Sequence, residues 1–223
     1  MGWWENESLL KFQSPTTMVV SGASQTGKTS MVRDLLVNRY ACFERNPINV
    51  LFCYNIWQPL FDEMQKEITT INFMEGLPTE EDILKLSENK NHSICVLDDL
   101  AYQAKDSPFV QKLFCILSHH RNVTIIFIVH NIFEKGKMMR TISLNAHYIV
   151  LFRNMRDESQ VRTLARQIHP ENSKYLTMAY KLAVGEKRHG YLIIDLSIGA
   201  NRKYHLRSGF LPGEDISVYL PLK

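Results

Sequence analysis

Residues 22–29 read Gly22-Ala23-Ser24-Gln25-Thr26-Gly27-Lys28-Thr29, and this stretch decides the fold. The apolar run Thr17 to Ser21 precedes it, and apolar side chains recur at helical spacing from Lys28 to Tyr40 behind it. The pattern GxxxxGK[ST] therefore lies where a strand passes into a helix. Glycines let such a backbone curl so that its N–H groups point inward, and the helix N-terminus adds its dipole. The stretch predicts a loop that cradles the phosphates of ATP.

Each residue type in the loop has an expected task. Lys28 is expected to reach the β- and γ-phosphates, and the Thr29 hydroxyl to be a ligand of Mg²⁺. The predicted nucleotide-binding residues are Gly22, Ala23, Ser24, Gln25, Thr26, Gly27, Lys28, Thr29 and Ser30.

A second acidic element follows at Ser93-Ile94-Cys95-Val96-Leu97-Asp98-Asp99, an apolar strand that ends in two carboxylates. Asp98 is predicted to hold Mg²⁺ through its hydration shell. Asp99 is predicted to polarise the attacking water, a role that a glutamate usually fills. Asp is one methylene shorter, so the water must sit closer. The alternative is that Asp98, Asp99 and Leu100 simply begin a loop or cap a helix.

The interval between Lys28 and Asp98 is 70 residues, which leaves room for a strand and two helices. This spacing favours the additional-strand, RecA-like class of P-loop ATPases. GTPases would show DxxG and NKxD, but Asn89-Lys90-Asn91-His92 lacks the aspartate and precedes the acidic strand. Nucleotide kinases usually lack the tandem acids and need an arginine-rich lid.

The rest of the chain alternates strand-length apolar runs with helix-like stretches, which predicts a mostly parallel α/β sheet with helices on both faces. We expect one P-loop ATPase domain over 1–223, with a core of about 14–198 and a C-terminal tail of about 199–223. Within the tail, the segment from Gly209 to Lys223 is expected to be a frayed terminus, and docking onto a neighbouring subunit or the capsid is the alternative. Further strands are expected at Val50–Tyr54, Thr124–Val129, Tyr148–Phe152 and Tyr191–Leu196. Further helices are expected at Pro59–Lys66, from Thr79, at Pro108–Leu117 after a Ser107 N-cap, at Asp157–Ile168 and at Ser173–Ala183.

Two polar residues, His130 and Asn131, follow the apolar run Thr124–Val129. In an additional-strand ATPase this strand lies between the loop strand and the acidic strand, so its end faces the γ-phosphate. His130 is the first choice for a sensor of that phosphate, and Asn131 is the second. The alternative is a plain polar turn.

Arg121 precedes the same strand and is a candidate arginine finger that reaches the ATP of a neighbouring subunit. Arg140 is a second candidate, and a solvated loop arginine is the alternative. His119 and His120 lack a Cys, Asp or Glu partner at metal-ligand spacing, so no metal is expected there.

Charge is distributed unevenly, although the net charge is only +3. The span from His130 to Phe210 holds fourteen Lys or Arg against six acids, which suits a polyanionic partner, whereas solvated helix faces would give the same count. The basic residues Lys135, Lys137 and Arg140 and the turn Lys187-Arg188-His189 are candidate DNA contacts. Apolar runs are strand-sized, so no membrane partner is expected. Cys42, Cys53, Cys95 and Cys115 show no metal spacing and are expected to be reduced thiols.

Together, GASQTGKT, VLDDL, SHHRNVTIIFIVHNIF and RTISLNAHYIVLFRNMRDESQVRTLARQI resemble the genome-packaging ATPases of the HerA–FtsK superfamily. Those of Maverick/Polinton elements and adintoviruses are the most similar. The resemblance covers roughly Thr16 to Ile168, and its distinctive part is Ser118 to Asp157. His130 stands where relatives commonly carry Gln, which would make hydrolysis pH-sensitive, because a protonated imidazole cannot accept a hydrogen bond from water.

The resemblance implies a homo-oligomeric ring, a pentamer or hexamer, that hydrolyses ATP with Mg²⁺ and drives double-stranded DNA into a preformed capsid. It implies Walker A roles for Lys28 and Thr29, Walker B roles for Asp98 and Asp99, and a trans contact from an arginine near Arg121. Viral capsid or vertex proteins would be partners. The expected location is the host nucleus or cytoplasm at viral assembly sites, or the virion.

Two other functions stay open on the sequence. One is a nucleoside or small-molecule kinase that uses the same loop. The other is a nucleotide-gated module that binds capsid proteins and hydrolyses little ATP, a reading favoured by Asp99 in place of Glu.

Overall fold

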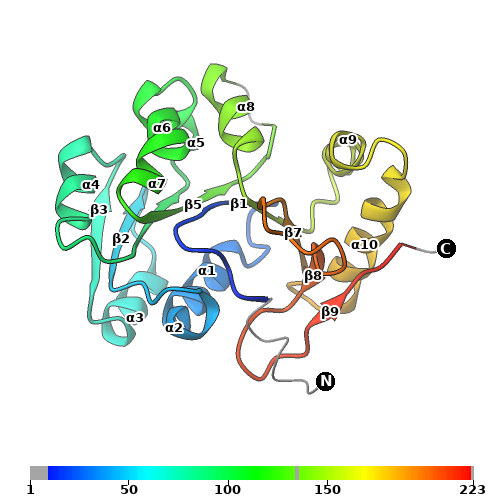
Figure 1. Cartoon of the computed structure of the whole chain (residues 1–223), viewed down its shortest axis with the longest axis horizontal. Coiled ribbons are helices and arrows are strands. Elements are labelled where there is room, and N and C mark those ends of the chain that lie inside the picture. The colour runs from blue at the N-terminus through cyan, green and yellow to red at the C-terminus, as the bar shows by residue number, and fades with distance from the viewer. Residues whose placement is uncertain (1–9, 134–135, 222–223) are drawn as a thin grey trace.

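The computed structural model describes residues 10–133 and 136–221, and within them one sheet forms the centre of the molecule (Figure 1). Its nine strands lie in the order β3-β2-β4-β5-β1-β6-β7-β8-β9. The strands are β1 Thr17–Ser21, β2 Asn49–Tyr54, β3 Ile71–Glu75, β4 Ser93–Asp98, β5 Val123–Val129, β6 Tyr148–Phe152, β7 Tyr191–Asp195, β8 Leu206–Ser208 and β9 Ser217–Val218. The pairs among β1 to β6 are parallel, and β7, β8 and β9 each run antiparallel to the preceding strand.

The helices connect these strands and cover both faces of the sheet (Figure 1). They are α1 Lys28–Val37, α2 Arg39–Cys42, α3 Pro59–Glu67, α4 Glu80–Leu86, α5 Ala101–Ala104, α6 Pro108–Lys112, a π-helical segment Leu113–Leu117, α7 Ser118–His120, α8 Lys137–Leu144, α9 Ser159–Ile168 and α10 Ser173–Glu186.

Alternate strand residues enter two separate apolar cores. Val19 and Phe127 pack with α4 to α10 on one face, whereas Val20 and Ile126 pack with α1, α2 and α3 on the other. Strands that are covered on both faces need apolar side chains at consecutive positions, and this explains the continuous apolar runs in the sequence. The predicted α/β fold with helices on both faces is confirmed.

The predicted additional strand is also confirmed, because β5 pairs in parallel with both β1 and β4. The six predicted strands match the observed ones to within one residue at either end. Ser107 accepts a hydrogen bond from the Val110 N–H at the start of α6, and Thr79 forms a capping box with Asp82 at the start of α4. The predicted helix at 28–40 is interrupted at Asn38.

Several elements were not predicted. β3 is an edge strand whose side chains are all partly or fully exposed, so it lacks the continuous apolar run that marks the inner strands. The segment from Gly209 onward, expected to be a frayed terminus, instead contains β9, which pairs with β8 at the end of the sheet. Three thiols, Cys42, Cys53 and Cys95, are buried; Cys115 is partly exposed, and all four are free. Within the described part of the chain, no helix combines the length and apolar character needed to span a bilayer.

Arg207 in β8 holds the C-terminal strands to the rest of the sheet. Its side chain is 1% exposed, and its Nη1 lies 3.3 Å from Oδ2 of Asp195 in β7. The guanidinium also donates to the carbonyls of Tyr204 and Leu10, which brings the start of the described chain to the same place. A buried cation needs such partners, because an unpaired one loses its hydration without compensation.

Replacing Asp195 with Ala is therefore expected to lower the free energy of unfolding by about 3 kcal/mol, since the buried Arg207 cation loses its partner. Urea denaturation measures the change. Asp195 also accepts from Ser197, so Ser197→Ala is the matched control and should cost at most about 1 kcal/mol. Equal losses in the two variants would contradict this role for the ion pair.

Candidate functional site

The loop between β1 and α1 closes tightly around its own backbone. Gly22 donates from its N–H to the Val129 carbonyl at 3.4 Å, and a Cβ there would lie 2.5 Å from the Cβ of Phe152. Gly27, the N-cap residue of α1, has a φ of 97°, which favours glycine. Both glycines of the motif are thus required by the shape of the loop. Gln25 also has a positive φ, 61°.

Lys28 lies inside this loop. Its side chain is buried, and its Nζ donates to the carbonyls of Gly22 and Ala23, each at 2.8 Å. The Thr26 hydroxyl donates to the same Ala23 carbonyl at 2.8 Å. Burial lowers the pKa of Lys28, while the nearby carboxylates of Asp98 and Asp99 oppose that shift. The loop therefore holds the Lys28 ammonium group inside the predicted phosphate-binding site, where the motif requires a cation.

The two acids follow from the end of β4. Asp98 is buried, and the Thr29 hydroxyl donates to its Oδ2 at 3.3 Å. Burial raises the pKa of Asp98 to about 6, with a smaller contribution from Asp99, while Thr29 and Lys28 favour the charged form. Asp99 has a φ of 55°, so the chain turns sharply after the strand.

His130 at the end of β5 contacts Asp99 at the end of β4. His130 Nε2 lies 3.2 Å from Asp99 Oδ1, and both side chains are about half exposed. A neutral imidazole with hydrogen on Nε2 donates to the carboxylate and holds its orientation. This contact joins two residues for which the sequence predicted separate roles, Asp99 as the group that polarises water and His130 as the phosphate sensor.

These elements surround a cleft of about 290 Å³, close to the lower limit for small-molecule sites. It is lined by Ser24, Gln25, Gly27, Lys28, Thr29, Ser30, Gln58, Leu60, Asp98, Asp99, Ile128, Val129 and His130. Gln58 and Leu60 come from the start of α3 and were not predicted. The signal for them was their place after β2, whose end reaches the same edge of the sheet as β4.

Three predicted residues lie elsewhere. Asn131 is not among the residues that line the cleft, and its side-chain oxygen accepts from the Phe133 N–H at 2.7 Å, as in a local turn. Arg121 precedes β5 and so lies at the opposite edge of the sheet, where it cannot serve the cleft of its own chain. Arg140 is exposed on α8. Lys135 lies outside the described residues.

His189 was expected among DNA contacts but lies against the loop. Its Nδ1 is 3.1 Å from the Thr26 carbonyl, and its ring would be 3.2 Å from a Cβ on Gly27. The neighbouring Lys187 pairs with Glu214 at 3.0 Å. The turn after α10 therefore packs on the loop and on the C-terminal segment.

The donor set fits Mg²⁺ bound together with phosphates. The Thr29 hydroxyl and the Asp98 carboxylate are adjacent oxygen donors, the type that Mg²⁺ prefers. Among the described residues no cluster of three or more His, Cys, Asp or Glu could hold a metal by itself. Mg²⁺ usually takes one or two protein oxygens and completes its shell with water and substrate phosphates.

A parallel sheet with a strand inserted between the loop strand and the acidic strand defines the P-loop NTPase fold of the additional-strand type. Comparison with solved structures agrees. The chain is similar to the genome packaging NTPase B204 of Sulfolobus turreted icosahedral virus 2 in its sulfate complex, with a TM-score of 0.59 and 12% identity over 94% of this chain and 98% of that one.

Two further structures of B204 match as well. The complex with ATP-gammaS gives a TM-score of 0.52 and 13% identity, covering 93% of this chain and 97% of the other. The AMP complex gives 0.51 and 13%, covering 82% and 93%. At this identity the likeness shows the fold alone. No protein-family model matches the sequence, and no curated protein does.

The raised pKa of Asp98 predicts how stability depends on pH. Because the folded-state pKa of about 6 exceeds the ordinary value of 3.8, ionised Asp98 destabilises the nucleotide-free fold. The cost is complete above pH 6 and disappears below about pH 4. Asp98→Asn should therefore stabilise the protein by about 3 kcal/mol at pH 8 and have little effect at pH 4.

Thermal unfolding without nucleotide, repeated across that pH range, measures this difference. The half-exposed Asp99 supplies the control, since Asp99→Asn is expected to change stability much less. A constant gap between Asp98→Asn and the wild type from pH 4 to 8 would rule out this explanation.

Proposed function

We propose that the chain is an ATP-hydrolysing motor that drives double-stranded viral DNA into a preformed capsid and acts as an oligomeric ring. One observation carries the proposal: the 22–29 loop, the Asp98–Asp99 pair and His130 line the same cleft. The similar fold of a viral genome packaging NTPase, whose structures contain nucleotides or analogues, supports it.

In this proposal the loop N–H groups and Lys28 bind the phosphate chain of ATP and neutralise its charge. Thr29 and Asp98 hold Mg²⁺, which when bound supplies positive charge that stabilises the phosphates in the transition state. Lys28 has to leave the carbonyls of Gly22 and Ala23 to reach the phosphates, and those are neutral partners that a phosphate group outcompetes.

Asp99 accepts the proton of the attacking water, and His130 holds the carboxylate in position through the contact at 3.2 Å. The shorter side chain of Asp99 requires the water to lie close to the end of β4. Asn131 remains a secondary sensor candidate. Arg121 lies at the far edge of the sheet, a position that leaves it available to a neighbouring subunit, and Arg140 is the second candidate for that contact.

The partners in this proposal are double-stranded DNA, further copies of the chain in a pentameric or hexameric ring, and capsid or vertex proteins. Its place of action is the viral assembly site in the host nucleus or cytoplasm, or the virion. The second candidate function is a nucleotide-gated capsid-binding module with little hydrolysis. It is favoured by the engagement of Asp99 with His130, which leaves the carboxylate one free oxygen for water.

Phosphate release with and without duplex DNA tests the motor directly. Turnover should rise when duplex DNA is added at low salt and fall again as salt is increased, because DNA binding depends on counterion release. If saturating duplex leaves turnover unchanged in a protein shown to be oligomeric, translocation is excluded.

Two variants separate hydrolysis from binding. Lys28→Ala is expected to reduce turnover by about 100-fold or more, since a cation on the transferred phosphate is lost. Asp99→Asn should also reduce turnover by about 100-fold but retain ATP binding, because the general base alone is removed. If Asp99→Asn hydrolyses ATP as fast as the wild type, Asp99 is not the general base. If the wild type itself binds ATP tightly but hydrolyses almost none, the nucleotide-gated module is favoured over the motor.

A further inference from the structure

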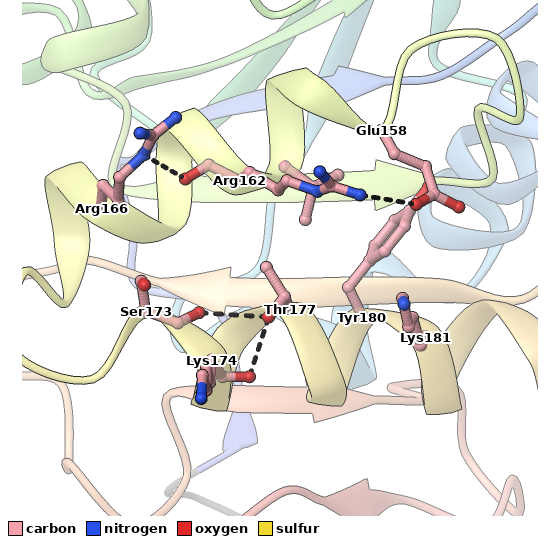
Figure 2. Close-up of a pocket in the computed structure, with 9 residues that line it drawn as sticks. Glu158, Arg162, Arg166, Ser173, Lys174, Thr177, Tyr180 and Lys181 are labelled. Atoms are coloured by element: carbon pink, nitrogen blue, oxygen red, sulfur yellow. Dashed lines mark hydrogen bonds and ion pairs between the residues drawn. The ribbon is translucent and has the colours of Figure 1, made fainter.

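A groove of about 390 Å³ runs between α9 and α10, away from the nucleotide cleft (Figure 2). Its lining includes Glu158, Arg162, Arg166, Lys174, Tyr180 and Lys181. Tyr180 is buried at its base, where the hydroxyl donates to the Phe152 carbonyl and accepts from the Asn154 N–H. The groove therefore has a fixed floor and two walls that are each an α-helix.

Four basic side chains line the walls, two from each helix, as Figure 2 shows. Arg162 and Arg166 belong to α9, whereas Lys174 and Lys181 belong to α10. All four are exposed. Within the described residues neither lysine ammonium has a partner, and Arg166 bonds only to the Arg162 carbonyl of its own helix.

One acid, Glu158, shares the groove. Its Oε2 lies 3.8 Å from Arg162 Nη2, with both side chains at least half exposed, so the pair is weak. Four basic side chains accompany this single acid, so among the described residues the groove keeps an excess of positive charge.

The opposite end of the molecule is acidic. Between Asn49 and Asn91 the sequence holds eight acids and three bases, and this segment forms β2, β3, α3 and α4. Asp62, Glu63, Glu75 and Glu88 are exposed, and in the described part of the chain no ion pair involves them. Figure 1 places α3, β3 and α4 at one end of the long axis and α9 and α10 toward the other.

The acidic end is also structurally open. β3 is the last strand on its side of the sheet, and every one of its side chains is partly or fully exposed, while β4 and β5 are buried throughout. An uncovered edge strand presents unpaired backbone groups, which proteins commonly cover with another element or chain.

We propose that the α9–α10 groove receives the acidic α3–β3–α4 edge of a second copy of this chain. The two surfaces are different, they have opposite charge, and they lie on opposite ends of one molecule. Contact between them is head-to-tail, and head-to-tail contacts close into a ring when the rotation between copies permits. The inference rests on the proposed function in that it supplies the interface of the proposed ring.

Pairing of the groove's basic side chains with acids of the α3–β3–α4 edge is expected to set the register of the interface more than its affinity. Lys174 and Lys181 are seven residues apart, or about 10 Å along a helix, and the nine residues of α3 extend about 13 Å. One helix of the acidic edge is thus long enough to face both lysines.

Charge reversal in the full-length chain tests the interface, with mass measured by sedimentation velocity at about 0.1 M salt, where exposed charges still interact. Lys174→Glu with Lys181→Glu should weaken self-association by about 100-fold or more, because acids then face acids. Asp62→Lys with Glu63→Lys should do the same. The chain that carries all four changes has complementary ends again and should recover the wild-type mass.

The matched control for Lys174→Glu with Lys181→Glu is Arg45→Glu with Lys203→Glu. It lowers the net charge by the same amount, at exposed positions outside α3, β3, α4, α9 and α10. It should leave the mass unchanged. The recovery in the fourfold variant also shows that the reversed residues do not unfold the chain.

The remaining results overturn the inference in distinguishable ways. A wild type that assembles while all variants assemble equally well excludes this interface but leaves the ring and the motor in place. A wild type that is monomeric with and without ATP excludes both the interface and the ring. If Lys174→Glu with Lys181→Glu weakens binding of a 30-bp duplex probe (about three helical turns) yet keeps the wild-type mass, the groove is a nucleic-acid site instead. Charge-dependent assembly without ATP turnover supports the interface and removes the motor.

Discussion

Parallel strand pairing is the constraint on which the rest of this molecule depends. Because β1, β4 and β5 run in the same direction and lie side by side, their carboxyl ends meet at one edge of the sheet. The loop after β1, the acids after β4 and the imidazole after β5 are thereby gathered from positions more than a hundred residues apart. Any pairing that shifted β5 out of the centre would separate Asp99 from His130 and open the cleft.

The inner part of the sheet was predictable because burial on both faces leaves a clear trace in sequence. Thr17–Ser21 and Val123–Val129 are buried at every position and apolar at most of them, and the glycine-rich loop fixes the direction of the first strand. The order of β4, β5 and β1 then followed from the 70-residue interval between Lys28 and Asp98. Proximity of Asp99 and His130 could be anticipated, but not their direct contact at 3.2 Å.

The margins of the fold were not predictable for the opposite reason. β3 is half exposed and has mixed polarity, and β8 is only three residues long with a charged residue at its centre. Arg207 is buried through partners in β7 and near Leu10, a long-range arrangement that no local pattern encodes. Likewise Gln58 lines the cleft because β2 ends beside β4. The Asn131 side chain does not line it, and its oxygen accepts a hydrogen bond from the nearby Phe133 N–H.

The hydrogen bond from His189 to the Thr26 carbonyl has a mechanical consequence. His189 lies three residues beyond α10, a 14-residue helix about 21 Å long whose other end is at the amino edge of the sheet. A displacement of the Thr26 peptide is thus coupled through His189 to the end of α10, so the loop and this helix are expected to move together. The same helix carries Lys174 and Lys181. One rigid helix therefore connects the phosphate-binding loop to one wall of the basic groove.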